Sequence, residues 1–313
     1  DLPAPCEVSC VEALNGAGIT IRNNEKFIIE QAFKRGWVVD SGKPLHRTGK
    51  KIAVVGSGPA GIAAAWRLNQ LGHAVTLFER DDRFGGFLMY GIPNMKLPKD
   101  VVQRRIDTLT KVGIELVANT EVGKDITADE LKKTFDRVVI CTGAREARDL
   151  KVPGRELSGI MQATDFLKAA TQTVLKDGPA ANDQLKGKHV LVLGGGDTGN
   201  DCIGTAIRQG CADITQLEIT PALPAERTPQ NQWPEWPMVL KTGYGQKEAK
   251  ALFGDITAYA STVTAFFGKD GQVKEAEISQ VDHFKPVAGT EKKIKADLVV
   301  LAMGFTGAEQ WLF

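Results

Sequence analysis

Two glycine-rich turns carry the clearest chemical signal in this chain. Gly56-Ser57-Gly58-Pro59-Ala60-Gly61 follows the apolar run 51–55, and Gly194-Gly195-Gly196-Asp197-Thr198-Gly199 follows the apolar run 189–193. In a G-x-G-x-x-G turn the first glycine permits a tight turn, the second lets backbone approach a pyrophosphate, and the third allows close helix–strand packing. The phosphates then lie at a helix N-terminus, where free N–H groups favour negative charge. Two such turns, each between a strand pattern and a helix pattern, predict two dinucleotide sites.

An acidic residue ends the apolar run that follows each turn. Glu79 closes the run 74–78, about 20 residues beyond its turn, where a ribose-hydroxyl acceptor is expected. We favour that role for Glu79 over a solvated acid at a strand end. Glu218 stands at the matching place after the second turn, and taken alone it favours NAD, because a carboxylate would repel a 2′-phosphate. Arg227, in the loop beyond, could clamp that phosphate or be a solvated loop arginine, so NADPH and NADH both stay open.

The cysteines suggest electron transfer only near the start of the chain. Cys141, Cys202 and Cys211 lie in or beside apolar runs, and we interpret them as small buried hydrophobic residues. The sequence has no C-x-x-C or C-x₄-C pair that could act as a redox dithiol. Cys6 and Cys10 are its one close pair, and they could be free thiols or half of the ligand set of an iron–sulfur cluster.

These residues need elements to hold them, and the pattern of turns, strands and acids occurs twice. We predict an α/β fold with two Rossmann-like dinucleotide-binding domains of the glutathione-reductase type, preceded by a short helical segment. The predicted limits are 1–48 for the helical segment, 49–152 for the first domain, 153–300 for the second, and 301–313 for a return to the first.

Two further segments are open to more than one interpretation. Residues 83–98 combine paired glycines with an apolar run, so they could lie against a flat ligand or form an ordinary turn and core. The tryptophan- and proline-rich residues 233–237 are better interpreted as a packed loop than as a platform for stacking nucleic-acid bases, since no basic groove accompanies them.

Composition limits the class of protein. The chain has 313 residues, 42% hydrophobic and 25% charged, with a net charge of +1, which is typical of a soluble globular protein. That charge favours neither nucleic acid nor an anionic membrane as a partner, and no apolar run reaches the roughly 18 residues of a membrane span. With few cysteines and no secretory signal pattern at Asp1-Leu2-Pro3, we expect a cytoplasmic protein.

At four motifs the chain resembles the small (beta) subunit of NADPH-dependent glutamate synthase. The motifs are Val54–Gly61, Met89–Lys96, Gly194–Gly199 and Trp233–Pro237, and the resemblance covers nearly the whole chain. A wider group of FAD/NADPH iron–sulfur oxidoreductases shares the glycine turns; it includes the flavin half of dihydropyrimidine dehydrogenase and ferredoxin–NADP reductases of the transhydrogenase type. The combination of all four motifs favours glutamate synthase.

The resemblance implies FAD at the first turn and NADPH at the second, with electrons passing through [4Fe–4S] clusters to a large FMN-containing subunit. That partner would make glutamate from glutamine and 2-oxoglutarate. By motif, the residues implied to line FAD are Gly56, Ser57, Gly58, Pro59, Ala60, Gly61, Glu79, Arg80, Gly86, Phe87, Lys96, Val122, Thr142 and Gly143. Those implied to face the nicotinamide dinucleotide are Gly195, Gly196, Asp197, Thr198 and Arg227, and those implied to bind iron are Cys6 and Cys10.

The chain departs from the family pattern at both ends. Leu2 stands where the family has a cysteine, and the chain stops at Phe313, before the family's final Gly-Asp segment, so we expect part of a longer subunit. Two alternatives stay open: an electron-input module for another acceptor, such as a pyrimidine reductase or a ferredoxin, and a non-catalytic scaffold. We name no catalytic acid or base, because the redox chemistry of hydride transfer belongs to the cofactors.

Overall fold

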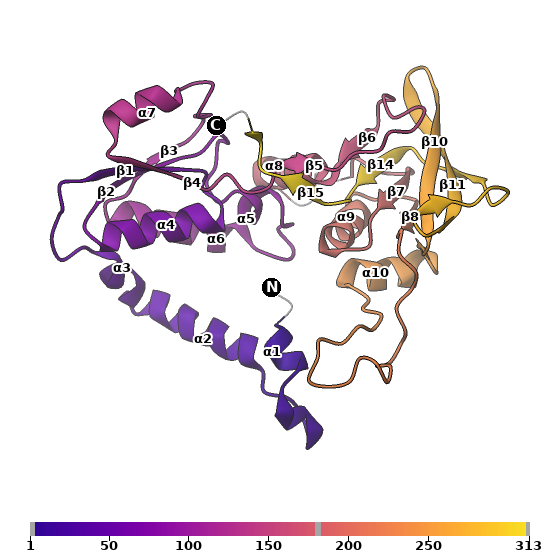
Figure 1. Ribbon diagram of the computed structural model, residues 1–313, viewed down its shortest axis with the longest axis horizontal. Coiled ribbons are helices and arrows are strands. Elements are labelled where there is room, and N and C mark those ends of the chain that lie inside the picture. Colours follow the sequence, from indigo (N-terminus) through magenta and orange to yellow (C-terminus); the bar gives the residue numbers. More distant parts are fainter. Residues whose placement is uncertain (1–3, 179–182, 311–313) are drawn as a thin grey trace.

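A parallel sheet stands behind each glycine turn, and the two sheets lie side by side along the long axis of the molecule (Figure 1). The computed structural model describes residues 4–178 and 183–310. Leu2 and the last three residues of the predicted return segment 301–313 therefore lie outside the described residues.

The first unit is a four-stranded parallel sheet in the order β3-β2-β1-β4. Its strands are β1 (Lys51–Val55), β2 (Ala74–Phe78), β3 (Glu115–Val117) and β4 (Arg137–Ile140), and its helices are α4 (Pro59–Gln70), α5 (Phe87–Tyr90), α6 (Lys99–Lys111) and α7 (Ala128–Thr134). Successive residues of β1 point to opposite faces: Val54 packs with residues of α4 and α6, and Ala53 and Val55 pack with Leu131 of α7. Both faces are buried, which explains the continuous apolar run.

The second unit repeats this plan with one more strand, in the order β6-β14-β7-β8-β9. Its strands are β6 (Ile160–Gln162), β7 (His189–Leu193), β8 (Asp213–Leu217), β9 (Thr257–Ala258) and β14 (Leu298–Leu301), and its helices are α8 (Ala163–Asp177), α9 (Asp197–Arg208) and α10 (Tyr244–Phe253). Strands β7, β8, β9 and β14 occupy the places of β1, β2, β3 and β4. Each glycine turn thus leaves a central strand of its sheet.

An antiparallel sheet covers the second face of the second unit. It contains β10 (Ser261–Lys269), β11 (Gln272–Asp282), β12 (Lys285–Pro286) and β13 (Lys292–Lys295). Leu191 and Leu193 of β7 pack against Phe266 and Ala276 of this sheet, while Val190 and Val192 face the helices.

A short antiparallel ribbon connects the two units. It pairs β5 (Glu146–Ala147) with β15 (Phe305–Gly307), and the backbone N–H groups of Arg145 and Arg148 donate to carbonyls of the returning chain at 2.9 Å each. The chain therefore crosses between the units twice, through neighbouring strands.

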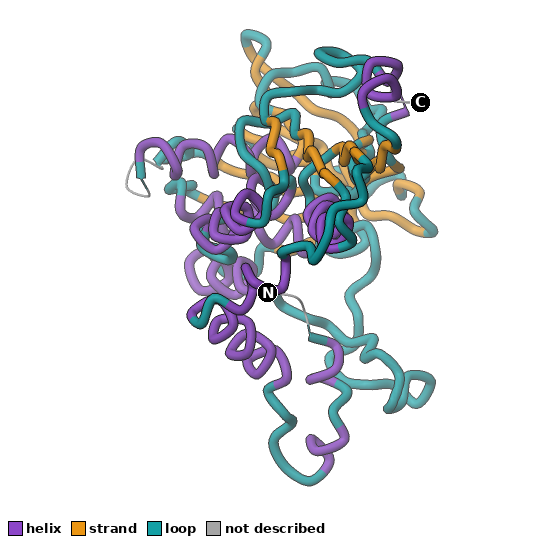
Figure 2. Tube along the Cα trace, turned by 90° about the vertical axis from the view of Figure 1, so that its left-hand side faces the viewer, coloured by secondary structure: helices purple, strands orange, loops and turns teal. Residues whose placement is uncertain are grey.

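The N-terminal helices project to one side of the two sheets, together with the long loop between β8 and α10 (Figures 1 and 2). They are α1 (Pro5–Val8), the 3₁₀ helix η1 (Val11–Leu14), α2 (Ile21–Lys34) and α3 (Trp37–Gly42). No residue of α2 is buried. It is held through Glu30, which accepts two hydrogen bonds from Arg104 of α6 at 2.8 and 2.7 Å. Near the start of the chain, between α1 and η1, the Ser9 carbonyl accepts a hydrogen bond from Trp233 Nε1 of the long loop at 3.4 Å.

The predicted fold class, two Rossmann-like units of α/β type, is confirmed. Strand β8 ends at Leu217, so Glu218 lies just beyond it, as Glu79 lies just beyond β2. Cys141 lies just after β4 and is half-buried rather than inside a buried strand. The antiparallel sheet of residues 261–295 was not predicted.

Candidate dinucleotide-binding sites

The first glycine turn is shaped by close backbone contacts at its first and last glycines. Gly56 has φ +95°, and a Cβ there would lie 2.6 Å from the Cys141 carbonyl oxygen. A Cβ at Gly61 would lie 1.8 Å from the Gly56 carbonyl oxygen. Gly58 is different, because a Cβ there would meet no protein atom within 4 Å. The space next to Gly58 is therefore open, and a pyrophosphate could approach the backbone there.

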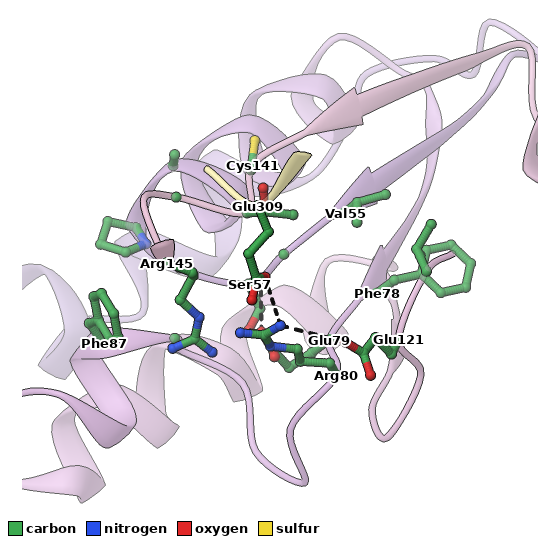
Figure 3. A pocket seen from close by; sticks show the side chains of 18 of the residues that line it. Val55, Ser57, Phe78, Glu79, Arg80, Phe87, Glu121, Cys141, Arg145 and Glu309 are labelled. Atoms are coloured by element: carbon green, nitrogen blue, oxygen red, sulfur yellow. Dashed lines mark hydrogen bonds and ion pairs between the residues drawn. The ribbon is translucent and has the colours of Figure 1, made fainter. Parts of the chain in front are cut away.

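Glu79 ties the end of β2 to this turn (Figure 3). Its Oε2 accepts hydrogen bonds from the Ser57 N–H at 3.1 Å and from the Ser57 hydroxyl at 2.5 Å, and its Oε1 accepts one from the Asp81 N–H at 3.0 Å. The Ser57 hydroxyl oxygen accepts one from the Gly85 N–H at 2.9 Å. Both residues are buried, with Glu79 5% exposed. The carboxylate is thereby fixed at the sheet edge where a ribose is expected.

One pocket of about 180 Å³ opens beside the turn at the carboxyl ends of β1, β2 and β4. Of the residues implied to line FAD, those found in its wall are Gly56, Ser57, Gly58, Pro59, Ala60, Glu79, Arg80, Gly86, Phe87, Val122, Thr142 and Gly143. Segments far apart in the chain meet here because parallel strands end at the same edge. The open side of Gly58 at the start of α4 and the acid Glu79 at the end of β2 fit the pyrophosphate and the ribose of a dinucleotide.

Three charged residues of the pocket were not predicted from the sequence: Glu121, Arg145 and Glu309. Arg80 Nη1 lies 2.9 Å from Glu309 Oε2 and 3.6 Å from Glu121 Oε1 (Figure 3). Arg145 lines the wall with its guanidinium 4.9 Å from the centre of the Phe87 ring. Burial, reinforced by Arg80 nearby, lowers the pKa of Arg145.

The places of Arg145 and Glu121 in the pocket could have been predicted from the sequence. Arg145 and Glu121 come a few residues after β4 and β3, and ligands of open α/β sheets lie beyond the carboxyl ends of strands. The place of Glu309 could not have been predicted in this way, because it reaches the pocket from the other end of the chain.

Two residues implied to line FAD, Gly61 and Lys96, are not part of the pocket wall. Cys141, which was not implied to line FAD, is part of that wall. Gly61 packs behind the turn against Gly56. Lys96 instead points to the second unit, where its Nζ lies 3.0 Å from Asp201 Oδ1. Burial raises the pKa of the Cys141 thiol, so this cysteine is a neutral wall residue.

The second turn repeats the geometry of the first. Gly194 has φ +117°, and a Cβ there would lie 2.3 Å from the Ala302 carbonyl oxygen; a Cβ at Gly199 would lie 2.2 Å from the Gly194 carbonyl oxygen. A Cβ at Gly196 would meet no protein atom within 4 Å. The Gly195 N–H donates to Glu218 Oε2 at 2.6 Å. Contacts, open side and strand-end acid thus match those of the first site.

Of the side chains implied to face the nicotinamide dinucleotide, two lie beside the second turn and one is bonded to its own loop. Asp197 and Thr198 are exposed at the first turn of α9, beside the open side of Gly196. Arg227 is engaged by its own loop, where its guanidinium donates to the carbonyls of Asn231 at 3.1 Å and Glu235 at 2.9 Å. In this arrangement Arg227 shapes the loop.

Cys6 and Cys10 are free, on and just after α1, with Cys6 exposed and Cys10 half-buried. Among the described residues, no group of three or more His, Cys, Asp and Glu side chains could hold a metal ion. Two thiolates supply half of what a [4Fe–4S] cluster needs. The described residues alone therefore do not fit such a cluster.

The paired sites agree with a family match across both units. The model of the pyridine nucleotide-disulphide oxidoreductase family matches residues 50–312. The chain belongs to this family. The family is named for oxidoreductases that use a pyridine nucleotide, and the two paired turns of this chain offer two places where a nucleotide could bind.

Curated relatives narrow the comparison. The small chain of NADPH glutamate synthase from Bacillus subtilis is 48% identical over 322 residues, which cover 98% of this chain and 65% of that protein. The NADH glutamate synthase of Saccharomyces cerevisiae is 44% identical over 319 residues, covering 98% of this chain and 15% of that protein. This chain thus spans just under two thirds of the bacterial relative and a small part of the yeast one.

Solved structures give the same fold. Mycobacterium tuberculosis FprA in complex with NADPH superimposes with a TM-score of 0.58 at 18% identity, covering 83% of this chain and 72% of that one. At this identity the likeness concerns the fold alone. Among residues 4–178 and 183–310, no helix is long and apolar enough to cross a membrane.

Proposed function

We propose that this chain is the electron-input module of a glutamate synthase. It takes hydride from NADPH to FAD held at the first turn, and electrons then leave for a large FMN-containing partner in the cytoplasm. The observation that carries the proposal is the pair of equivalent glycine turns, each with an open second glycine and an acid bonded to the turn. The bacterial and yeast glutamate synthases support the choice among members of the family.

The chain's own residues bind and orient at both sites. The free N–H groups at the start of α4 and α9 face the open sides of Gly58 and Gly196 and favour phosphate. Glu79 presents a fixed carboxylate to a ribose, and Arg80 and Arg145 place positive charge in the same pocket. FAD, when bound, supplies the hydride acceptor. The part of the protein is to bring the two nucleotides together in one orientation.

The proposed coenzyme is NADPH, with NADH as the alternative. The bacterial relative is named for NADPH and the yeast relative for NADH. Glu218 favours a free 2′-hydroxyl, and Arg227 would have to release the carbonyls of Asn231 and Glu235 to reach a 2′-phosphate.

The electron acceptor lies outside the described residues. Cys6 and Cys10 would contribute two thiolates to an iron–sulfur site, with the other ligands supplied elsewhere in the assembled enzyme. The size of the yeast relative supports a large partner, because the region similar to this chain is only 15% of that protein.

The proposal is tested by anaerobic mixing of the FAD-loaded protein with NADPH while the flavin absorbance is followed. We expect the wild-type flavin to be bleached. Gly196→Val should keep FAD and lose this reduction, because a branched side chain fills the space beside α9. A Gly196→Val protein that is bleached as fast as wild type would contradict the second site, and a wild-type protein without flavin would contradict the first.

A further inference from the structure

The strongest unassigned feature is an ion pair that crosses between the two units. Lys96 follows α5 in the first unit, and its Nζ lies 3.0 and 3.2 Å from the two carboxylate oxygens of Asp201 in α9. The Tyr244 hydroxyl of α10 donates to Asp201 Oδ1 at 2.9 Å. The side chain of Lys96 is 18% exposed and that of Asp201 is 6% exposed, so the pair is largely shielded from solvent and salt.

A second pair joins the same segment to the neighbouring helix. Lys168 Nζ of α8 lies 2.5 Å from Asp81 Oδ1, and Arg145 Nη2 lies 3.6 Å from Asp81 Oδ2. The side chain of Asp81 is 9% exposed. Loop residues 79–98 of the first unit are therefore held by both α8 and α9.

Part of this interface is open, next to the apolar contact of Leu175 in α8 with the cluster that contains Met89 of α5. A cavity of about 400 Å³ lies beside the Lys96–Asp201 pair and is lined from both units, by Met95 on one side and by Leu167 and Thr205 on the other. Since apolar packing there is incomplete, it fixes the relative orientation weakly. A buried pair of charges tolerates only the geometry in which both partners meet, and for that reason it can specify an orientation.

Both members of the pair are attached closely to a nucleotide site. Asp201 lies about one turn inside α9, whose N-cap is Gly196. Lys96 lies a few residues after α5, whose first residue, Phe87, lines the first pocket. The units are also joined by the β5–β15 ribbon. The ion pair is thus placed to control rotation about that ribbon.

We propose that Lys96 and Asp201 are positioning residues that hold the second unit in one orientation, so that a nicotinamide bound at α9 is presented to FAD in the first pocket. The part of this inference that concerns hydride transfer rests on the proposed function. The part that concerns orientation does not, and it is measured separately.

The test compares the FAD-loaded wild-type protein with Lys96→Met, Asp201→Asn and the double variant. X-ray scattering in solution reports the relative arrangement of the units, and anaerobic rapid mixing with NADPH reports flavin reduction. Lys250→Met is the matched control, because it removes an exposed lysine–aspartate pair within the second unit. Lys96→Arg keeps the charge and should retain wild-type behaviour; Lys96→Gln replaces Lys96→Met if that variant does not fold.

We expect both single variants to scatter as more extended molecules and to be reduced about 10-fold to 100-fold more slowly at saturating NADPH, the scale of a misplaced reactant. FAD content and NADPH affinity should be retained, and the double variant should be no slower than the singles, because both changes break one interaction. Unchanged scattering, additive effects, or loss of FAD only in the Lys96 variant would overturn the proposal. Wild-type protein that NADPH cannot reduce would refute the proposed function and leave the scattering result to decide the orientation.

Discussion

The glycines of the two turns have two different physical roles, and substitutions can separate them. Gly58 borders open space in an ordinary extended conformation, whereas Gly61 touches the backbone of its own turn. We therefore expect Gly58→Val to fold with nearly wild-type stability and to lose FAD, because the side chain occupies the pyrophosphate space. Flavin content after purification measures the loss, and urea unfolding of the flavin-free protein measures the stability.

Gly61→Ala is the contrasting variant. It adds less volume, yet its Cβ would lie 1.8 Å from the Gly56 carbonyl oxygen, so we expect it to destabilise the fold by about 1–3 kcal/mol or more. A Gly58→Val protein that retained full flavin would remove the first turn from the FAD site.

The charge of Glu218 should bias the choice of coenzyme. Its carboxylate is held at the second turn by the Gly195 N–H, where it would repel a 2′-phosphate. Glu218→Gln keeps an oxygen acceptor and removes the charge, so kcat/KM for NADPH relative to NADH should rise about fivefold, which corresponds to about 1 kcal/mol. Steady-state kinetics with both coenzymes measure the ratio, and a ratio that does not change would place the 2′-position away from Glu218.

Residue types and spacing were enough to predict the parts of each site that are local in sequence. The turns and Glu79 fall within one strand-turn-helix-strand unit, whose spacing is fixed by the fold. Lys96 could not be placed in this way, because its partner Asp201 belongs to the other unit. Arg227 is a similar case, since either a phosphate or its own loop carbonyls could satisfy a guanidinium.

At the scale of elements, short helix α5 depends on a buried lysine of its neighbour. Lys99, the first residue of α6, is 4% exposed. Its Nζ donates to the carbonyls of Leu88 at 2.9 Å and Ile92 at 2.5 Å, in and just after α5. Burial lowers the pKa of Lys99 to about 8, against a smaller opposite effect of Asp201. The lysine thus holds α5 in place, but burial makes its charged form less stable.

This arrangement makes the stability of the fold depend on pH. Between about pH 8 and the ordinary value of 10.5, the unfolded chain keeps the lysine proton and the folded chain does not. The contribution of Lys99 to the free energy of unfolding should therefore rise with pH across that window, by about 3 kcal/mol at most, and be flat below it. The buried thiols of Cys202 and Cys211, whose pKa values are raised, act in the opposite direction, so the contribution is measured against a variant that lacks the lysine. The difference in free energy of unfolding between wild type and Lys99→Met should therefore grow in favour of wild type across the window, whereas the control Lys250→Met should stay parallel to wild type. Urea unfolding at several pH values measures the slope, and parallel curves for wild type and Lys99→Met would contradict the assignment.

Strands with continuous apolar runs could be predicted from the sequence, whereas the antiparallel sheet that covers the second unit could not. The runs that became β1 and β7 are buried on both faces, so their apolar signal is continuous. Strands β10 and β11 are long, but many of their residues are exposed or half-exposed, and the short strand β13 has the sequence Lys-Lys-Ile-Lys. Their apolar positions are too few to stand out, because only one side of that sheet is covered by β7 and β14.

At the scale of the whole molecule, the described residues provide two nucleotide sites and no complete exit for electrons. Helix α1, which carries Cys6, lies on the side to which the N-terminal helices and the long loop project (Figure 1). Cys10 follows Ser9, whose carbonyl accepts the hydrogen bond from Trp233. Trp233 belongs to the second unit, so the loop links the nicotinamide-binding unit to the cysteine segment.

The last prediction concerns that exit. Because two thiolates cannot complete a four-ligand cluster, this chain purified alone should contain no stoichiometric iron, and NADPH should still reduce an artificial acceptor through FAD. In the enzyme assembled with its larger partner, Cys6→Ser and Cys10→Ser should each lower iron content and the rate of glutamate formation, while flavin content stays unchanged. Iron and sulfide analysis, with glutamate formation measured in parallel, decides the matter. Full iron content in both assembled variants would show that these cysteines are free thiols and that electrons leave the flavin by another route.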